Sequence, residues 1–93
     1  MNTFNELFGP SIYLLALDLF LENPEDLMNV REVARRINRN PGSVSRVLPR
    51  LINKGYVTCT RVGAKIVAYK LNQGNTVVQL LLEFCEKFED ARD

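Results

Sequence analysis

The chain has 93 residues, of which 46% are hydrophobic and 25% are charged, a composition typical of one globular domain rather than a disordered protein. No apolar run approaches the roughly 20 residues that span a bilayer, and residues 1–8, a short lead, do not have the pattern of a secretion signal. The two cysteines, Cys59 and Cys85, are too few for a disulfide framework. We expect both to be reduced thiols that fill the core of a cytoplasmic protein.

The net charge of +1 conceals an uneven distribution of charge along the chain. From Arg31 to Lys70 there are ten Lys or Arg residues and one acid, Glu32, which gives +9. The rest of the chain has two basic residues and ten acids, which gives −8. A basic middle between acidic ends is typical of a surface that binds phosphates, with a solvated basic face as the alternative.

Two helices are predicted before the middle of the chain. The first, 11–22, is apolar on nearly every side, so its second face is expected to contact a partner subunit or the last helix. Its narrow polar strip, expected to face solvent, consists of Ser11, Asp18 and Glu22. The second helix, 30–38, begins after Asn29 with Glu32 three residues later, a capping-box pattern with Asn at the cap.

A third helix, predicted over 41–54, has two chemically different faces. Asn40 and Pro41 can begin it, and Gly55 can end it in a left-handed conformation. One face is an apolar stripe made of Val44, Val47, Leu48 and Leu51. The opposite face is small, polar and cationic, and consists of Gly42, Arg46, Pro49 and Asn53, flanked by Ser43, Ser45 and Arg50. Such a helix suits the major groove of DNA, although Pro49 removes one backbone hydrogen bond and is expected to bend it.

The second half of the chain predicts a hairpin and one more helix. After Gly55 the apolar period changes from 3.6 to 2, which indicates a β-hairpin over 56–71. A last helix is predicted over 76–90. The expected fold class is therefore α+β, mostly α, with an α-α-α-β-β-α order in a single domain over residues 1–93.

The third helix and the start of the hairpin resemble a known family. The residues that carry the resemblance are Ser43, Val44, Ser45, Arg46, Leu48, Leu51, Gly55, Tyr56 and Val57. With the preceding helix and turn they are similar to the winged helix-turn-helix of prokaryotic transcription regulators, including the MarR, ArsR and TrmB-like groups. The likeness covers about residues 11–90. It implies sequence-specific binding of double-stranded DNA by a small dimeric transcriptional regulator, with the third helix in the major groove and the hairpin, or wing, on a flanking groove or phosphates.

The candidate DNA-binding residues divide by their chemistry. Arg46 is the first candidate for base readout, because its forked donors match O6 and N7 of guanine. Ser43 and Ser45 are short enough to approach a phosphate or a base edge. The remaining candidates are expected to contact the phosphate backbone, and they are Arg35, Arg36, Arg39, Asn40, Arg50, Lys54, Arg61 and Lys65.

The terminal helices predict a homodimer. In the resembling families such helices often pair across a two-fold axis, and a symmetric dimer would match two half-sites about one DNA turn apart. The expected interface residues are Leu14, Leu17, Leu21, Val77, Leu81, Phe84 and Phe88. The alternative is that both helices simply close one small core.

No metal site, cofactor or enzymatic activity is predicted. The chain has no histidine, and its two cysteines are isolated, so no cluster has the spacing of metal ligands. A histidine base and a Gly-rich phosphate loop are both missing, and the acids are expected on helix exteriors as solvated charges. Two other functions stay open, a winged helix that contacts proteins and a protein that coats DNA without sequence preference, and the residues specify no effector.

Overall fold

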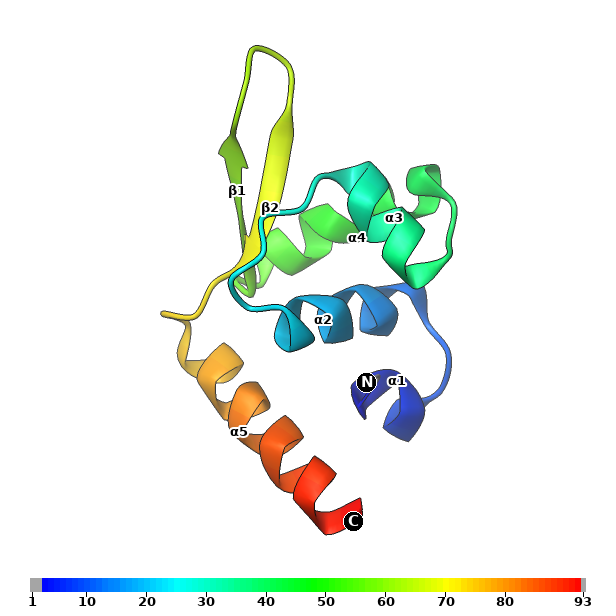
Figure 1. Ribbon diagram of the computed structural model, residues 1–93, viewed down its shortest axis with the longest axis vertical. Helices are drawn as coiled ribbons and strands as arrows, with labels where there is room; N and C mark the ends of the chain where they lie inside the picture. Colours follow the sequence, from blue (N-terminus) through cyan, green and yellow to red (C-terminus); the bar gives the residue numbers. More distant parts are fainter. Residues whose placement is uncertain (1–2, 93) are drawn as a thin grey trace.

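The computed structural model describes residues 3–92, which form five helices and one β-hairpin (Figure 1). The helices are α1 (Thr3–Phe8), α2 (Ile12–Glu22), α3 (Val30–Ile37), α4 (Pro41–Asn53) and α5 (Thr76–Arg92), and the strands are β1 (Val57–Arg61) and β2 (Val67–Leu71). The predicted fold class is confirmed, with α1 as an additional helix before the α-α-α-β-β-α order. This helix occupies most of the expected lead, whose Met1 and Asn2 lie, like Asp93, outside the described residues.

Each helix from α2 to α5 begins at a side chain that accepts a backbone N–H of the first turn. The capping residues are Ser11, Asn29, Asn40 and Asn75, with donor–acceptor distances from 2.7 to 3.1 Å. Helix α4 continues through Pro49 to its last residue. The chain turns away at Gly55, whose φ of +82° is a conformation that glycine adopts without strain.

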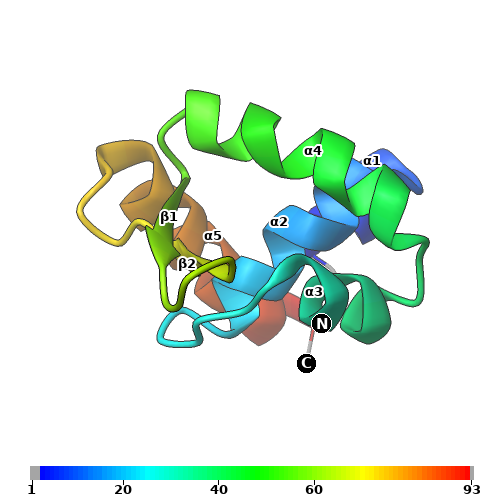
Figure 2. The ribbon, with the colours of Figure 1, turned by 90° about the horizontal axis from the view of Figure 1, so that it is seen from above.

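The core lies where α2, α3 and α4 meet the base of the hairpin. The apolar stripe of α4 faces it, and Val44, Leu48 and Leu51 are fully buried. Phe20 from α2 and Val33 from α3 are also fully buried in the same cluster. Seen from above, α4 lies along one side of α2 (Figure 2). This packing leaves the opposite side of α4 facing away from the core.

The wing is an antiparallel pair in which Val57 is opposite Leu71 at the base and Arg61 is opposite Val67 near the tip. Its base is buried, and its tip projects beyond the helices (Figure 1). Two backbone hydrogen bonds between Met28 and Tyr69, of 2.9 and 2.8 Å, join β2 to the loop that precedes α3. The wing is therefore fixed beside the start of α3.

Two residues expected at a dimer interface lie in the core instead. Leu17 and Leu21 are 5% and 6% exposed, and Leu14 is half-buried against the same cluster. Helices α1 and α5 both pack on α2 and cover its second apolar face. The prediction that Leu17 and Leu21 contact a partner subunit is therefore wrong.

One cysteine also differs from the prediction. Cys85 is half-buried against the core, whereas Cys59 is exposed on β1. Only Val57 of β1 is buried, because no helix covers the hairpin beyond its base. The expectation of a core position is therefore wrong for Cys59.

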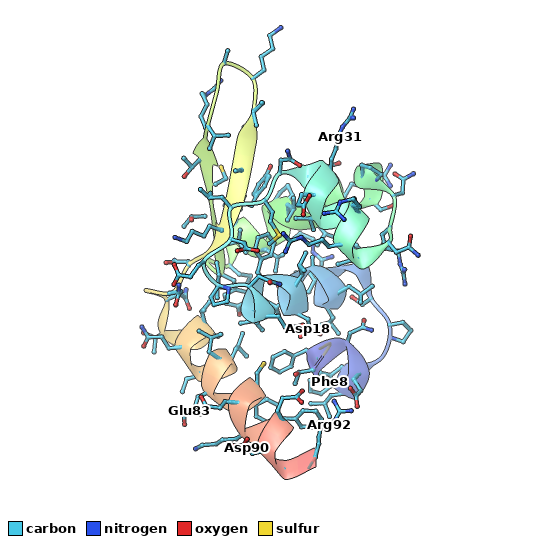
Figure 3. All side chains as sticks on the ribbon, in the orientation of Figure 1. Phe8, Asp18, Arg31, Glu83, Asp90 and Arg92 are labelled. Atoms are coloured by element: carbon cyan, nitrogen blue, oxygen red, sulfur yellow. The ribbon has the colours of Figure 1, made fainter. Side chains whose placement is uncertain are left out.

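Asp18 joins α1 to α2. The residue is 1% exposed, and its carboxylate accepts the backbone N–H groups of Phe4 and Asn5 at 3.0 and 2.9 Å. Figure 3 places it on the side of α2 that faces α1. Burial raises the pKa of this carboxyl above its ordinary value. The expectation of a solvated acid is wrong for Asp18, because α1 needs an acceptor at its first turn and covers it.

Replacing Asp18 by Ala should destabilise the fold, because it leaves two N–H groups of α1 without their acceptor. We expect the free energy of unfolding to fall by roughly 1–3 kcal/mol, measured by urea denaturation. Asp90→Ala, at an exposed position of α5, is the matched control and should change stability by less than about 0.5 kcal/mol. A loss for Asp18→Ala no larger than that of the control would contradict this role.

The same substitution has a defined pH dependence. Because the pKa of Asp18 is raised in the folded state, the contribution of this carboxyl is fully present below the unfolded-state pKa of about 3.9. It declines as the pH rises through the folded-state pKa. The stability difference between the natural chain and Asp18→Ala should therefore narrow from pH 3.5 to pH 7. A difference that widens over this range would contradict the assigned direction of the shift.

Candidate nucleic-acid interface

The outward face of α4 is exposed and carries no acidic side chain. Arg46 is exposed on this face, while Val44 and Leu48 on the other side hold the helix in the core. Within residues 3–92, no ion pair or hydrogen bond engages the Arg46 guanidinium. Next to it, the Ser45 hydroxyl donates to the carbonyl of Gly42 at 2.9 Å. Arg46 is therefore oriented by the core and free to bind an external group.

The second half of α4 contains a contact that the sequence did not predict. The guanidinium carbon of Arg50 lies 4.6 Å from the centroid of the Tyr13 ring on α2, a cation–π contact. The pKa of Tyr13 lies above its ordinary value, because burial and then the nearby Tyr56 raise it by more than the positive charge of Arg50 lowers it. Tyr13 thus holds Arg50 against the surface of the domain.

Lys54 is exposed at the end of the helix.

The turn before α4 uses its polar side chains within the fold. The guanidinium of Arg39 donates to the carbonyl oxygen of Asn38 at 3.0 Å and to that of Ile37 at 3.4 Å, at the end of α3. Asn40 caps α4 through a 2.7 Å bond from the N–H of Gly42. Both residues are exposed, so these roles leave them accessible to a ligand.

Two of the candidate phosphate contacts are already paired with acids. Arg35 and Arg36 donate to the same carboxylate oxygen of Glu32, at 2.6 and 2.5 Å, and Arg36 also donates to Asp26 at 3.1 Å. These bonds lower the pKa of Glu32 and raise the pKa of Arg36. The positive charge of this pair is therefore partly neutralised before any ligand binds.

The wing tip carries two candidate phosphate contacts, Arg61 and Lys65, of which only Arg61 is engaged in a contact within the loop. The guanidinium of Arg61 donates to the carbonyl of Ala64 at 2.9 Å and closes the loop. Lys65 is exposed, and within residues 3–92 it forms no ion pair. Lys65 is thus unpaired at the tip, whereas Arg61 already has one of its donors engaged by the loop.

Arg31 is a further candidate, one that the sequence pattern alone does not single out. It lies in the first turn of α3 and extends toward the side to which the wing projects (Figure 3). A groove of about 360 Å³ lies between the start of α3 and the wing, with Arg31 and Lys65 among its lining residues. In the sequence Arg31 is only one of ten basic residues between Arg31 and Lys70, because its position beside the wing depends on how the hairpin packs.

The charges of the chain separate in space. Figure 1 shows α3, α4 and the wing in one half of the molecule and α1 and α5 in the other. Glu83 and Asp90 of α5 lie at the end opposite the wing tip (Figure 3). The basic middle of the sequence therefore forms one pole of the molecule, and the acidic C-terminal helix forms the other.

Two further properties concern the part of the chain that the structure describes. Between Thr3 and Arg92, no helix is long and apolar enough to cross a bilayer. In the same range, no three Cys, Asp or Glu side chains are placed to hold a metal ion together.

Comparisons with known proteins relate this arrangement to established folds. A family model described as the IclR helix-turn-helix domain matches residues 13–60, which run from α2 through α4 to β1. No curated protein matches the chain significantly.

Several solved structures have similar folds. One is ZitR from Lactococcus lactis, a C30AH42A mutant in apo form (TM-score 0.70, 15% identity, 97% of this chain and 67% of that chain). Another is the ferric uptake regulator from Francisella tularensis with iron (TM-score 0.64, 24% identity, 73% of this chain and 58% of that chain). A third is Mb0332 from Mycobacterium bovis, a homodimeric winged helix-turn-helix DNA-binding domain (TM-score 0.64, 21% identity, 87% of this chain and 69% of that chain). This chain thus spans little more than half the length of the ferric uptake regulator, and these likenesses show a shared fold.

The resemblance to winged helix-turn-helix regulators is confirmed at the level of the fold, while a MarR, ArsR or TrmB-like membership stays a prediction. The matched segment covers α2, α3 and α4, the helices that fix the orientation of Arg46. The chain belongs to the IclR helix-turn-helix domain family.

Proposed function

We propose that this chain is a sequence-specific double-stranded DNA-binding protein that regulates transcription, with α4 in the major groove. The observation that carries the proposal is the state of Arg46, which is exposed and unpaired within residues 3–92 on a helix held in the core. Membership of a helix-turn-helix family supports it. The fold is also similar to that of wild-type ZitR from Lactococcus lactis in its complex with DNA (TM-score 0.61, 14% identity, 84% of this chain and 56% of that chain).

The proposed roles follow the chemistry of each side chain. Arg46 reads a guanine through its two parallel donors, and the small side chains beside it let α4 approach the bases. The phosphate backbone is contacted from both ends of α4 and from the wing, by Arg39, Asn40, Ser43, Ser45, Arg50, Lys54, Arg61 and Lys65. Arg35 and Arg36 contribute less, because Glu32 already neutralises part of their charge.

We further propose that the protein acts as a homodimer through α5 and α1. Of the eight large hydrophobic side chains exposed within residues 3–92, five lie on these two helices. They are Leu7, Phe8, Val77, Leu80 and Phe84. On α5 they recur at three- and four-residue spacing, and Phe84 stacks on Phe4 of α1 at 5.6 Å between ring centroids. Exposed apolar side chains on two neighbouring helices are typical of a subunit interface.

Replacing Arg46 by Ala should relax base preference at one position in each half-site. A bidentate arginine–guanine pair contributes about 1–3 kcal/mol of discrimination against the wrong base. The measurement is the affinity of both proteins for a preferred duplex and for its single-base-pair variants. Lys54→Ala is the control and should weaken binding to all of these duplexes by the same factor. If Arg46→Ala also weakens them uniformly, Arg46 is a phosphate contact and base readout by Arg46 is refuted.

Replacing Leu80 by Glu should dissociate the dimer without unfolding the subunit. Leu80 is 59% exposed in the subunit, so the new charge opposes only the contact between subunits. The mass in solution, measured by light scattering after size-exclusion chromatography, should fall from two chains to one. Leu27→Glu is the matched control, since Leu27 is 54% exposed but lies in the loop before α3. A natural chain that is monomeric, or a Leu80→Glu variant that stays dimeric, would contradict this interface.

A further inference from the structure

Two exposed arginines, Arg46 and Arg50, lie one turn apart on the same side of α4. Residues four apart on a helix are neighbours, and two like charges at this spacing repel each other. Within residues 3–92, neither arginine is paired with an acid. The surface proposed for DNA therefore carries two adjacent cations of the same chemistry, and the contacts of each side chain determine what it can bind.

The ring of Tyr13 distinguishes the two arginines. The guanidinium carbon of Arg50 lies 4.6 Å from the centroid of this ring, at which distance a cation is attracted by the ring face. Tyr13 belongs to α2, along which α4 lies (Figure 2), so the contact draws Arg50 toward α2. Within the described residues, no aromatic ring contacts the guanidinium of Arg46. Tyr13 thus fixes one arginine of the pair and leaves the other free.

The contact with Tyr13 holds Arg50 without consuming its hydrogen-bond donors. Within residues 3–92, the guanidinium of Arg50 donates no hydrogen bond. Other arginines of the basic middle are held through their donors, Arg36 by two acids and Arg39 and Arg61 by backbone carbonyls. Arg50 is therefore held in place while its donors stay available to a phosphate, which arginine binds through paired N–H groups.

Tyr13 is itself fixed by the fold. It lies in the first turn of α2, which Ser11 caps by accepting the N–H of Leu14 at 3.1 Å. Its ring is half-buried and packs against the core. Burial and then the nearby Tyr56 raise the pKa of Tyr13, so the phenol is neutral at pH 7 and its contact with a cation does not titrate there. A rigid ring beside a long side chain lowers the rotamer entropy that Arg50 loses when it binds.

We propose that Tyr13 is a positioning residue that commits Arg50 to a backbone phosphate and leaves Arg46 to read the base. The proposal rests on the proposed function, because it divides the work of α4 between its two exposed arginines. Tyr13 acts through Arg50 and needs no contact of its own with DNA. Phosphate contacts fix the register of a protein on the duplex and carry no sequence information, so the gain in affinity from Tyr13 is the same for every base sequence.

The contact is tested first without DNA, by nuclear magnetic resonance of the free protein. The ring of Tyr13 should shift the side-chain protons of Arg50 upfield. The shift should persist in Tyr13→Phe, which keeps the ring, and disappear in Tyr13→Leu, which keeps only apolar volume. Arg50 protons that resonate at the same position in the natural chain and in Tyr13→Leu would overturn the proposal and leave the proposed function standing.

Binding to a preferred duplex then tests what the contact does. Tyr13→Leu should weaken binding roughly three- to fivefold, by the same factor for the single-base-pair variants of that duplex. Tyr13→Phe should bind like the natural chain. The slope of log K against log salt should be unchanged in Tyr13→Leu and should fall by about 0.9 in Arg50→Ala, because only Arg50→Ala removes a phosphate contact. Natural affinity in Tyr13→Leu, or an altered base preference, would overturn the proposal.

The double variant separates positioning from packing. In the Arg50→Ala background, Tyr13→Leu should change the affinity by less than about 1.5-fold, because Tyr13 acts through the side chain that is already lost. An equal loss in both backgrounds, or a Tyr13→Phe variant as weak as Tyr13→Leu, would overturn the positioning role. A natural chain with no affinity for any duplex at low salt would overturn the proposed function, and the role of Tyr13 with it, even where the resonance shift is present.

Discussion

The burial of one face of α4 is the interaction on which the arrangement of the molecule depends. Val44, Leu48 and Leu51 are fully buried, and each large apolar side chain contributes about 1.5–3 kcal/mol when it is removed from water. Rotating the helix would expose this stripe, so the opposite face has one orientation relative to the domain. Arg46 is presented to the outside as a consequence of core packing, with no polar contact within residues 3–92 needed to hold it.

A second constraint positions the wing. A two-stranded hairpin is marginally stable by itself, and beyond its base this one is covered by no helix. Its direction is set by buried Val57 and Leu71 and by the paired backbone bonds between Met28 and Tyr69. The acidic helix α5 lies at the end of the molecule opposite the wing tip (Figure 3). Negative charge is therefore kept away from the surface that carries the wing. The surface proposed for DNA is thus built from a buried stripe, a backbone bridge and a separation of charge.

The sequence predicted what short-range periodicity and capping determine. The stripe of α4, its start at Asn40 and its end before Gly55 are all local patterns, and each agrees with the structure. Contacts between distant elements could not be predicted in the same way. The burial of Asp18 depends on α1 folding back over α2, and the pairing of Arg50 with Tyr13 depends on how α4 crosses α2. The positions of Leu17 and Leu21 could not be predicted either, because periodicity does not show which element covers an apolar face.

In the proposed function, one face of this domain reads a DNA sequence and two copies read it together. A selection from random duplexes with the purified protein tests this most directly. If the proposed function is right, the selected pool is enriched in a two-fold symmetric motif whose half-sites lie about one helical turn apart. A pool in which bound duplexes remain as random as the input would contradict it.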